Sequence, residues 1–422
     1  MHRSCRVGFN VLIVLFLANA IARAQLRDGD FVAICGDSIT EQRRYSVFIE
    51  DYLLMCQPKA KLRAMQFGWS GEVATQFAAR MSNDVLRYHP TVATTCYGMN
   101  DGGYAAYSEQ RGEQYRKAMT QIVQTFKNGG VRFIVVGSPG VVDPVYFNRP
   151  PGGQVYNDTL AKLRDIAQEV AREQNVAFAD VYTAMMQTMK AAKARLGEKY
   201  EVAGSDGFHP NNNGGLIMAY AFLKAMGCDG QIGTITVDLS SGRATASEGH
   251  RILSSGAEGI EIESTRYPFC FSSGPDGQAN SPAGTREIIQ FLPFNEELNR
   301  FRLVVSNADG SRLRVTWGSA SKEFSAEELA GGINLAAEFL DNPFSEQFAR
   351  VESLIRNHQG FEIPMIKSFV TKMAQFNEMA PGNQDCLDRI EQGMAKRRES
   401  MVAEAAAAVV PVRHVIKIEK IR

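Results

Sequence analysis

The feature that most constrains the fold is an alternation of short strand-like runs and helical patterns between Phe31 and Gly227. Five apolar runs are each followed by a stretch in which apolar residues recur at helical spacing. That order is typical of stacked βαβ units around a parallel sheet. We therefore expect an α/β fold with five parallel strands and helices on both faces. The predicted strands are Phe31–Cys35, Leu62–Phe67, Val92–Tyr97, Arg132–Gly137 and Ala177–Val181.

The pattern changes after Gly227. Stretches around Ile235, Ile260 and Leu303 alternate apolar with polar residues, and Asp309-Gly310 is a hairpin signal, so antiparallel strands are predicted. A chain of 422 residues exceeds the roughly 250 to 300 residues at which single cores stop growing. We predict an α/β domain at residues 25–229 and a β-rich accessory domain at residues 230–422. The second domain is expected to hold a helical insertion at about 345–408 and a last strand at Val412–Ile421.

The amino terminus predicts export. Arg3 and Arg6 precede an apolar run, Val7–Ala18, and the triplet Ala22-Arg23-Ala24 follows it. This order is typical of a secretory signal peptide, here residues 1–24, cleaved after Ala24. A membrane anchor is the alternative, but the run is shorter than the ~20 apolar residues that a span needs. We expect a secreted or periplasmic protein with no stable membrane span.

Charge and cysteine content narrow the function classes. The 46 Lys and Arg residues balance the 46 Asp and Glu residues, so no long-range field favours nucleic acid. The cysteines after Ala24 show neither a CxxC pair nor metal-ligand spacing. An exported protein permits disulfides, but the spacing alone assigns no pairing. The residues concerned are Cys35, Cys56, Cys96, Cys228, Cys270 and Cys386.

Ser38 is the first catalytic candidate. It stands in Gly36-Asp37-Ser38, directly after the first predicted strand, at the sheet edge where open α/β sheets bind ligands. A serine there can act as a nucleophile, and its backbone N–H at the start of a helix can bind an oxyanion. The same three residues also occur in plain turns, so this motif needs partners elsewhere.

Two more turns that follow predicted strands offer oxyanion donors. Gly71, in Gly68-Trp69-Ser70-Gly71, lets the backbone approach a ligand and aim an N–H at it. Asn100, in the loop after Val92–Tyr97, carries two N–H donors on its side-chain amide. Both turns also fit a purely structural interpretation, because Gly and Asn tolerate left-handed backbone.

The general base is identified by position. Asp206 and His209 lie three residues apart in one loop, so the carboxylate can hold one imidazole nitrogen and leave the other for a serine. His89 precedes a predicted strand instead of following one. The remaining histidines lie outside this domain, at His2, His250, His358 and His414. His209 is therefore the best available base.

Taken together and in this order, the four blocks resemble the SGNH hydrolase superfamily, also called GDSL-like esterases, over residues 30–227. The resemblance implies a flavodoxin-like α/β/α sandwich with a shallow, open site. It also implies a serine esterase that needs no metal or organic cofactor. The catalytic residues would be Ser38, Asp206 and His209, and the oxyanion hole would be formed by Ser38, Gly71 and Asn100.

Aromatic residues near the expected site, Tyr104 among them, make the chain similar to carbohydrate acetyl esterases. The expected substrate is a small-molecule or polysaccharide ester, and O-acetylated carbohydrate fits best. A short-chain lipase or thioesterase and a non-catalytic glycan-binding protein stay open as alternatives. The second domain could be a binding surface or a structural support, and the sequence leaves the oligomeric state open. Candidate substrate contacts are Trp69, Tyr97, Asp101 and Tyr146, the last in a long loop, 138–154, that also holds Arg149.

Overall fold

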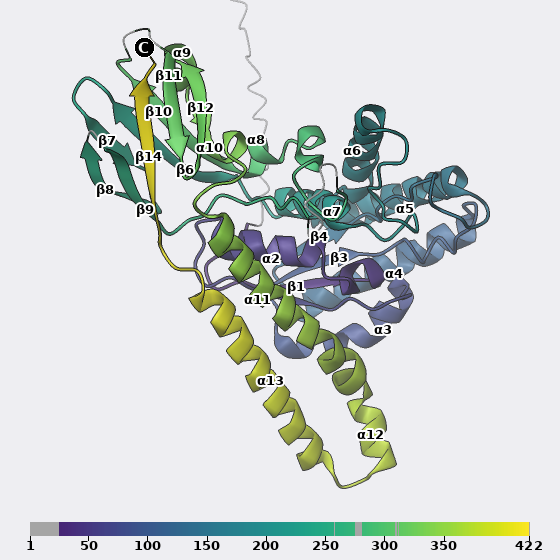
Figure 1. Ribbon diagram of the computed structural model, residues 1–422. Helices are drawn as coiled ribbons and strands as arrows, with labels where there is room; N and C mark the ends of the chain where they lie inside the picture. The colour runs from purple at the N-terminus through teal and green to yellow at the C-terminus, as the bar shows by residue number, and fades with distance from the viewer. Residues whose placement is uncertain (1–24, 257, 275–280, 309, 311, 422) are drawn as a thin grey trace, which may run out of the picture.

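The first half of the chain forms three layers, a parallel sheet between two layers of helices (Figure 1). The structure is a computed structural model and describes residues 25–256, 258–274, 281–308, 310 and 312–421. The predicted signal peptide lies outside these described residues. The sheet has the order β2-β1-β3-β4-β5, with every pair parallel. Its strands are β1 (Phe31–Gly36), β2 (Arg63–Gln66), β3 (Val92–Cys96), β4 (Phe133–Gly137) and β5 (Ala177–Ala179).

Helices cover both faces of this sheet. Val32 and Ile34 belong to the core shared with α2, α6 and α7, whereas Ala33 and Cys35 belong to the core shared with α3 and α4. Strands buried on both sides read as continuous apolar runs, which is why β1 showed no polar alternation in the sequence. The predicted α/β fold is confirmed. The helices are α1 (Ser38–Glu41), α2 (Tyr45–Met55), α3 (Ala74–Asp84), α4 (Glu109–Asn128), α5 (Gly153–Glu173), α6 (Val181–Leu196) and α7 (Asn212–Ala225), with a 3₁₀ turn at η1 (Leu86–Tyr88).

The second half contains two further sheets that share one apolar core. Their orders are β13-β10-β6-β7 and β12-β11-β14-β9-β8. Phe301 of one sheet meets Trp317 of the other, with 5.7 Å between the ring centroids. The last strand, β14, lies between β11 and β9 as expected. The strands are β6 (Gln231–Asp238), β7 (Arg243–Ala246), β8 (His250–Gly256), β9 (Gly259–Ser264), β10 (Arg300–Ser306), β11 (Arg312–Trp317), β12 (Ala320–Ser325), β13 (Ile333–Asn334) and β14 (Val412–Lys420).

Two expectations for these strands are wrong. β6 and β10 pair in parallel, not antiparallel. Because β7, β8 and β9 intervene along the chain, the connection is long enough for the crossover that a parallel pair requires. The strands that flank Asp309-Gly310, β10 and β11, belong to different sheets, so the chain passes between sheets there instead of folding back as a hairpin.

The helical insertion returns to the parallel sheet of the first half. α11 and α13 pack against each other, and α11 packs along α2 and β2 (Figure 1). The boundary between residues 229 and 230 stays a prediction, because these helices belong to one half by sequence and contact the other. The remaining helical segments are η2 (Ile288–Phe291), α8 (Phe294–Leu298), α9 (Ala326–Gly331), α10 (Leu335–Glu338), α11 (Ser345–Pro364), η3 (Met365–Phe369), η4 (Val370–Lys372), α12 (Met373–Met379) and α13 (Gln384–Ala407).

The insertion closes an open edge of the sheet. Edge strands leave backbone N–H and C=O groups without a neighbouring strand. At β2 the Gln66 N–H donates to the Glu362 carboxylate at 3.0 Å, and the Arg398 guanidinium donates to the Ala64 carbonyl at 2.6 Å. Glu362 and Arg398 are themselves ion-paired at 2.7 Å, and both are buried. Side chains of α11 and α13 therefore replace a sixth strand.

The described chain carries six cysteines, all of them free thiols, and the sequence assigned them no pairing. Cys35 and Cys96 are buried within β1 and β3, where each packs as a small apolar residue. None of the helices within the described residues is long and apolar enough to cross a bilayer.

We expect Arg398→Met to destabilise the protein by about 3–5 kcal/mol, because removing one partner leaves the buried Glu362 carboxylate without its main counter-charge. Urea denaturation followed by circular dichroism measures this. Arg397→Met is the matched control: Arg397 is the exposed neighbour on the same helix, and its loss should change stability by less than about 0.5 kcal/mol. Equal effects of the two substitutions would contradict a structural role for the Glu362–Arg398 pair.

Candidate active site

Ser38 sits on a tight turn at the carboxyl end of β1. Asp37 caps the short helix α1, because its carboxylate accepts the Ile39 N–H at 3.0 Å. Gly36 leaves room for this turn: a Cβ there would lie 2.1 Å from the Thr40 hydroxyl and 2.9 Å from the Cys96 carbonyl oxygen. The turn thus places Ser38 at the first position of α1, half-buried at the edge of the sheet.

His209 connects Ser38 to a carboxylate. Its Nε2 lies 2.9 Å from the Ser38 Oγ, and its Nδ1 lies 2.6 Å from an Asp206 oxygen. The other Asp206 oxygen accepts the backbone N–H groups of Phe208 and His209 at 3.1 and 3.0 Å. Burial raises the pKa of Asp206, but these hydrogen bonds outweigh burial and hold it below its usual value. The carboxylate therefore stays ionised and fixes the imidazole.

The side chain of Asn100 is held by hydrogen bonds to Tyr104 and Glu72. Its side-chain oxygen accepts the Tyr104 hydroxyl at 2.9 Å, and its Nδ2 donates to the Glu72 carbonyl at 3.1 Å. The amide has a second N–H, whose nearest protein acceptor is Asp37 at 3.5 Å, the outer limit of a hydrogen bond. This N–H is therefore available to a better acceptor, such as a developing oxyanion.

Gly71 belongs to the turn beside Asn100. Its φ of +77° lies in the left-handed region, which L side chains rarely adopt. The residue is exposed and lines the same cavity as Ser38 and His209. The requirement for glycine here is therefore one of backbone conformation, and the turn leaves the Gly71 backbone open to a ligand.

A buried ionic network packs beneath the turn that contains Gly71, on its protein-interior side. The Glu72 carboxylate pairs with Arg80 at 2.6 Å and also accepts the Tyr97 hydroxyl at 2.8 Å. Tyr97 is fully buried and stacks on Phe77, with 5.1 Å between the ring centroids. The expectation that Tyr97 contacts substrate is therefore wrong, since its ring packs into the core and its hydroxyl is bound to Glu72.

Two other expected substrate contacts also lie elsewhere. The Asp101 carboxylate accepts the backbone N–H groups of Ala74 and Gly98 at 2.9 and 3.0 Å, so it braces the loop instead of facing the cavity. The Tyr146 hydroxyl donates to the Lys199 carbonyl, and Tyr146 does not line the cavity. Both expectations rested on proximity in sequence to the strand ends, which fixes no side-chain direction.

Trp69 lies next to the cavity instead of within it. It lines an adjoining hollow of about 300 Å³ that shares Ser70 and Gly71 with the catalytic cavity. The Arg80 guanidinium and the Lys367 ammonium lie 4.9 and 5.1 Å from ring centroids of Trp69. The ring is thus already in contact with two cations, and substrate contact by Trp69 stays a prediction.

The catalytic cavity has a volume of about 520 Å³ and is bordered mostly by polar residues. Sequence reasoning missed several of them. Glu41 and Gln42 follow Ser38 by one helical turn, which was a usable local signal. Ile363 lies more than 300 residues further along the chain, and nothing in its sequence neighbourhood indicates the site. The lining residues are Ser38, Glu41, Gln42, Ser70, Gly71, Asn100, Tyr104, Arg149, Phe208, His209 and Ile363.

Residues of the helical insertion also support the turn that contains Ser70 and Gly71. Lys367, in the π-helical segment η3, donates to both Glu41 carboxylate oxygens at 2.8 and 2.9 Å. Glu41 in turn accepts the backbone N–H of Ser70, the residue before Gly71. The chain from Lys367 through Glu41 to Ser70 therefore connects the second half of the sequence to the backbone of the site.

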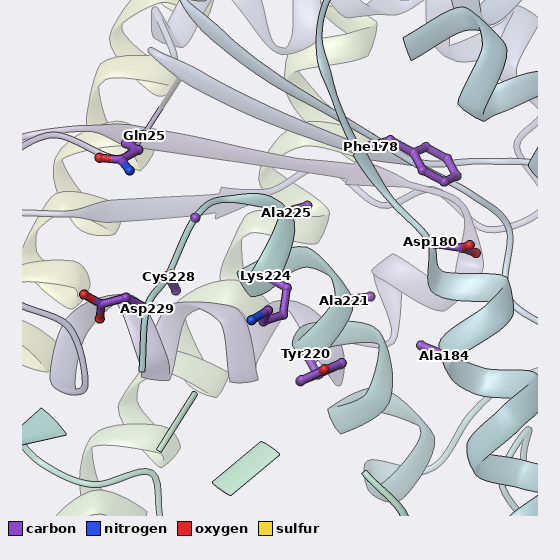
Figure 2. A pocket seen from close by; sticks show the side chains of 11 residues that line it. Gln25, Phe178, Asp180, Ala184, Tyr220, Ala221, Lys224, Ala225, Cys228 and Asp229 are labelled. Carbon is purple, nitrogen blue, oxygen red and sulfur yellow. The ribbon is translucent and has the colours of Figure 1, made fainter. Parts of the chain in front are cut away.

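A larger hollow of about 820 Å³ lies away from these groups, along β5 and α7 (Figure 2). In Figure 2, Tyr220 and Lys224 project from α7, and the structure pairs both with Glu297, at 2.9 and 2.8 Å. None of the candidate catalytic residues lines this hollow. The arrangement of reactive groups therefore identifies the site, and cavity size does not.

Burial raises the pKa of Asp37 to about 7, against backbone hydrogen bonds that lower it, and the nearby Asp101 and Glu72 raise it further. The folded state therefore binds more protons than the unfolded chain between about pH 4 and 7, so this group weakens the fold as pH rises. Asn cannot ionise but keeps the capping acceptor. At about 1.4 kcal/mol per pKa unit, Asp37→Asn should gain up to about 4 kcal/mol over the parent between pH 4 and 8.

Urea denaturation of parent and variant at these two pH values measures the difference. Asp158→Asn, a change at an exposed carboxylate of α5, should leave the difference near zero. Parallel pH profiles for the parent and Asp37→Asn would rule out this source of pH dependence.

Comparisons with known proteins give one family match and several solved structures with a similar fold. The family model described as GDSL-like lipase/acylhydrolase matches residues 34–215. No curated protein matches this chain. Among solved structures, BT4096, a gut microbial diltiazem-metabolizing enzyme, is similar at a TM-score of 0.73 and 23% identity, covering 94% of this chain and all of that one.

Two smaller solved structures resemble the first half. Axe2, an acetylxylan esterase from Geobacillus stearothermophilus, has a TM-score of 0.41 and 22% identity over 48% of this chain and 96% of its own. LAE5, an alpha/beta hydrolase enzyme from the metagenome of Lake Arreo, Spain, has a TM-score of 0.40 and 24% identity over 48% of this chain and 97% of its own. The match at residues 34–215, which is under half of the chain, identifies a GDSL-like lipase/acylhydrolase domain there, and the chain is an ester-hydrolysing enzyme.

Proposed function

We propose that this enzyme is an exported esterase that removes acetyl groups from carbohydrate through an acyl-enzyme on Ser38. The observation that carries the proposal is the continuous hydrogen-bonded line from the Ser38 Oγ through His209 to Asp206, at 2.9 and 2.6 Å. This line ends in a cavity that also contains Gly71 and Asn100. The arrangement contains a nucleophile, its base, the partner of the base and oxyanion donors.

In the first half-reaction, the Ser38 Oγ attacks the ester carbonyl carbon while His209 Nε2 takes the hydroxyl proton. The carbonyl electrons move to oxygen, and the N–H groups of Ser38, Gly71 and Asn100 stabilise that oxyanion. Asp206 stabilises the imidazolium that forms. When the intermediate collapses, the carbon–oxygen bond to the alcohol breaks, and the alcohol leaves with the proton from His209.

In the second half-reaction, water replaces the alcohol. His209 removes a proton from water, whose oxygen attacks the acyl-enzyme carbonyl and forms a second oxyanion at the same donors. Collapse breaks the bond to the Ser38 Oγ, releases the carboxylic acid and returns the proton to Ser38. Every proton thus passes through His209 Nε2, the nitrogen that faces Ser38 in the resting enzyme.

The lining of the cavity favours a small acyl group on a polar alcohol. Most of its residues are polar, and its apolar ones, Tyr104, Phe208 and Ile363, are too few to line a channel for a long acyl chain. Apolar burial is worth about 0.8 kcal/mol per CH₂ group, so a site that cannot bury a chain gains little from a long one. A sugar hydroxyl ester fits this lining better than a lipid ester.

Export rests on the amino-terminal sequence. The basic residues, apolar run and Ala22-Arg23-Ala24 triplet favour cleavage after Ala24. An exported enzyme would meet polymeric carbohydrate directly, which agrees with an open cavity at the sheet edge. Comparing the amino-terminal residue of protein from the culture medium or periplasm with that of total protein tests this part of the proposal.

Ser38→Ala should abolish acetate release from nitrophenyl acetate and from an acetylated polysaccharide. Loss of a catalytic-triad serine costs about 10⁴-fold or more in kcat. The variant should keep the parent's thermal unfolding transition, because Ser38 is half-buried and its side chain bonds only to His209 in the described chain. Acetate release by a folded Ser38→Ala protein at the parent's rate would overturn the acyl-enzyme mechanism.

An acyl series on one alcohol tests the acyl preference. We expect kcat/KM to fall by at least about tenfold from acetyl to octanoyl nitrophenyl esters, because the cavity is open and the described residues form no enclosed channel there that would bury the longer chain. A rise along the series would favour a lipase or thioesterase instead.

Lys367→Met should lower kcat by about tenfold with little change in KM. Without its cation, Glu41 no longer fixes the Ser70–Gly71 turn, and losing an oxyanion donor altogether costs about 10²- to 10³-fold. Lys367→Arg should restore most of the activity, and Lys372→Met, at an exposed lysine of the following segment η4, should behave as the parent. A change in KM alone, or no rescue by arginine, would contradict a positioning role.

A further inference from the structure

Arg149 occupies a defined position at the catalytic cavity. It comes from the loop between β4 and α5 and lines the cavity together with Ser38 and His209. Its guanidinium carbon lies 4.5 Å from the ring centroid of Tyr104 and 4.4 Å from that of Phe208. Those two rings meet edge to face at 5.8 Å, so the guanidinium rests in an aromatic corner. Each such contact is worth ~0.5–1 kcal/mol at an exposed site, and together they orient the planar group.

Each of the two rings, Tyr104 and Phe208, contacts one residue of the proposed catalytic site. The Tyr104 hydroxyl donates to Asn100 at 2.9 Å, and the Phe208 ring lies 4.2 Å from the imidazole of His209. Tyr104 has a φ of +50°, an uncommon conformation that costs free energy in a bulky residue, so the surrounding structure must hold it there. A single aromatic side chain therefore separates Arg149 from Asn100, the proposed oxyanion donor, and another separates it from His209, the proposed base.

The charge of Arg149 is uncompensated within the described chain. The other charged groups of the cavity have partners: Glu41 pairs with Lys367 at 2.8 Å, and His209 pairs with Asp206 at 2.6 Å. In the part of the chain that the structure describes, no carboxylate lies within 4.0 Å of the exposed Arg149 guanidinium. By contrast, Arg80 beneath the same turn pairs with both Glu72 and Asp84.

We propose that Arg149 binds a carboxylate on the alcohol part of the substrate, so that the preferred esters are acetylated acidic sugars of the uronic acid type. This rests on the proposed function, which it deepens. The planar guanidinium fork matches a carboxylate with two parallel hydrogen bonds. The carboxylate must be on the sugar, since an acetyl group has no position for a charge. Bound in this way, the sugar ring lies between Arg149 and Ser38 in one cavity.

A purely structural role for Arg149, covering the two rings, makes a different prediction. Loss of such a cover would disturb Asn100 and His209 for every ester alike. Loss of an anion-binding group would lower activity only on charged esters, mainly through KM, and would remove the dependence of that activity on salt. The ratio of kcat/KM for matched charged and neutral esters separates the two roles.

The experiment uses the full-length mature enzyme and two sugars with the same ring and the same single acetyl group: an acetylated methyl glucuronoside and the corresponding methyl glucoside. We expect the parent to prefer the glucuronoside by about 10- to 100-fold in kcat/KM at low salt, the size expected for a charge-assisted hydrogen-bonded pair. Arg149→Gln should bring the ratio close to one, and the ratio is the readout, because a general disturbance of the site would lower kcat/KM for both sugars alike.

Two further variants sharpen the result. Arg149→Lys should keep part of the preference, because it keeps the charge and loses the fork. Arg172→Gln, at an exposed arginine near the end of α5, should keep all of it. A ratio that Arg149→Gln leaves unchanged, or a loss of nitrophenyl acetate hydrolysis as large as the loss on the glucuronoside, would overturn the proposal in favour of a structural role.

Failure of the proposed function is distinguishable from failure of this inference. If neither sugar releases acetate, carbohydrate deacetylation fails for these esters. Calorimetric titration of Ser38→Ala protein with glucuronate then still tests Arg149, because binding needs no turnover. Tighter binding of glucuronate than of glucose, lost on adding Arg149→Gln to Ser38→Ala, would support the anion site. If Ser38→Ala and the double variant Ser38→Ala/Arg149→Gln bind glucuronate equally well, an anion site at Arg149 is excluded.

Discussion

The ion pair between Glu362 and Arg398, within the helical insertion, covers the open edge of the parallel sheet. Both charges are buried, and each residue also bonds to the backbone of β2, which connects the second half of the chain to the first. Ile363 follows Glu362 directly and lines the catalytic cavity. Lys367 follows within one further turn and reaches Glu41. The interaction that closes the sheet edge therefore also fixes one wall of the site.

The catalytic groups themselves come from turns at one sheet edge, and a second buried network holds them. Glu72 uses its carboxylate on Arg80 and Tyr97 and its carbonyl on Asn100. Removing Arg80 would leave the buried Glu72 carboxylate without its counter-charge, a cost of several kcal/mol. The proposed oxyanion donors thus depend on a network whose members, Glu72, Arg80 and Tyr97, do not line the cavity.

The sequence predicted the parallel sheet because apolar runs of strand length mark buried parallel strands. The family resemblance then named Ser38, Gly71, Asn100 and His209 as site residues, and the structure places these four at one cavity. Their catalytic roles stay a prediction. Side-chain direction was not predictable in the same way, which is why Tyr97 was placed in the site although it packs into the core. Ile363 and Lys367 were missed because they reach the site through tertiary contacts alone.

The same contacts predict that the second half of the chain does not detach from the first as an independent module. Removing residues 230–422 would expose the backbone of β2 and the buried carboxylate Glu50, which pairs with His358 of α11. It would also remove Lys367 from Glu41. Loss of activity on truncation would then follow from an open sheet edge, whatever the second half binds. Its contribution to the site is separable from its contribution to folding at single side chains that reach the site without closing the edge. Ile363 lines the cavity and Lys367 binds Glu41, so these two are such positions.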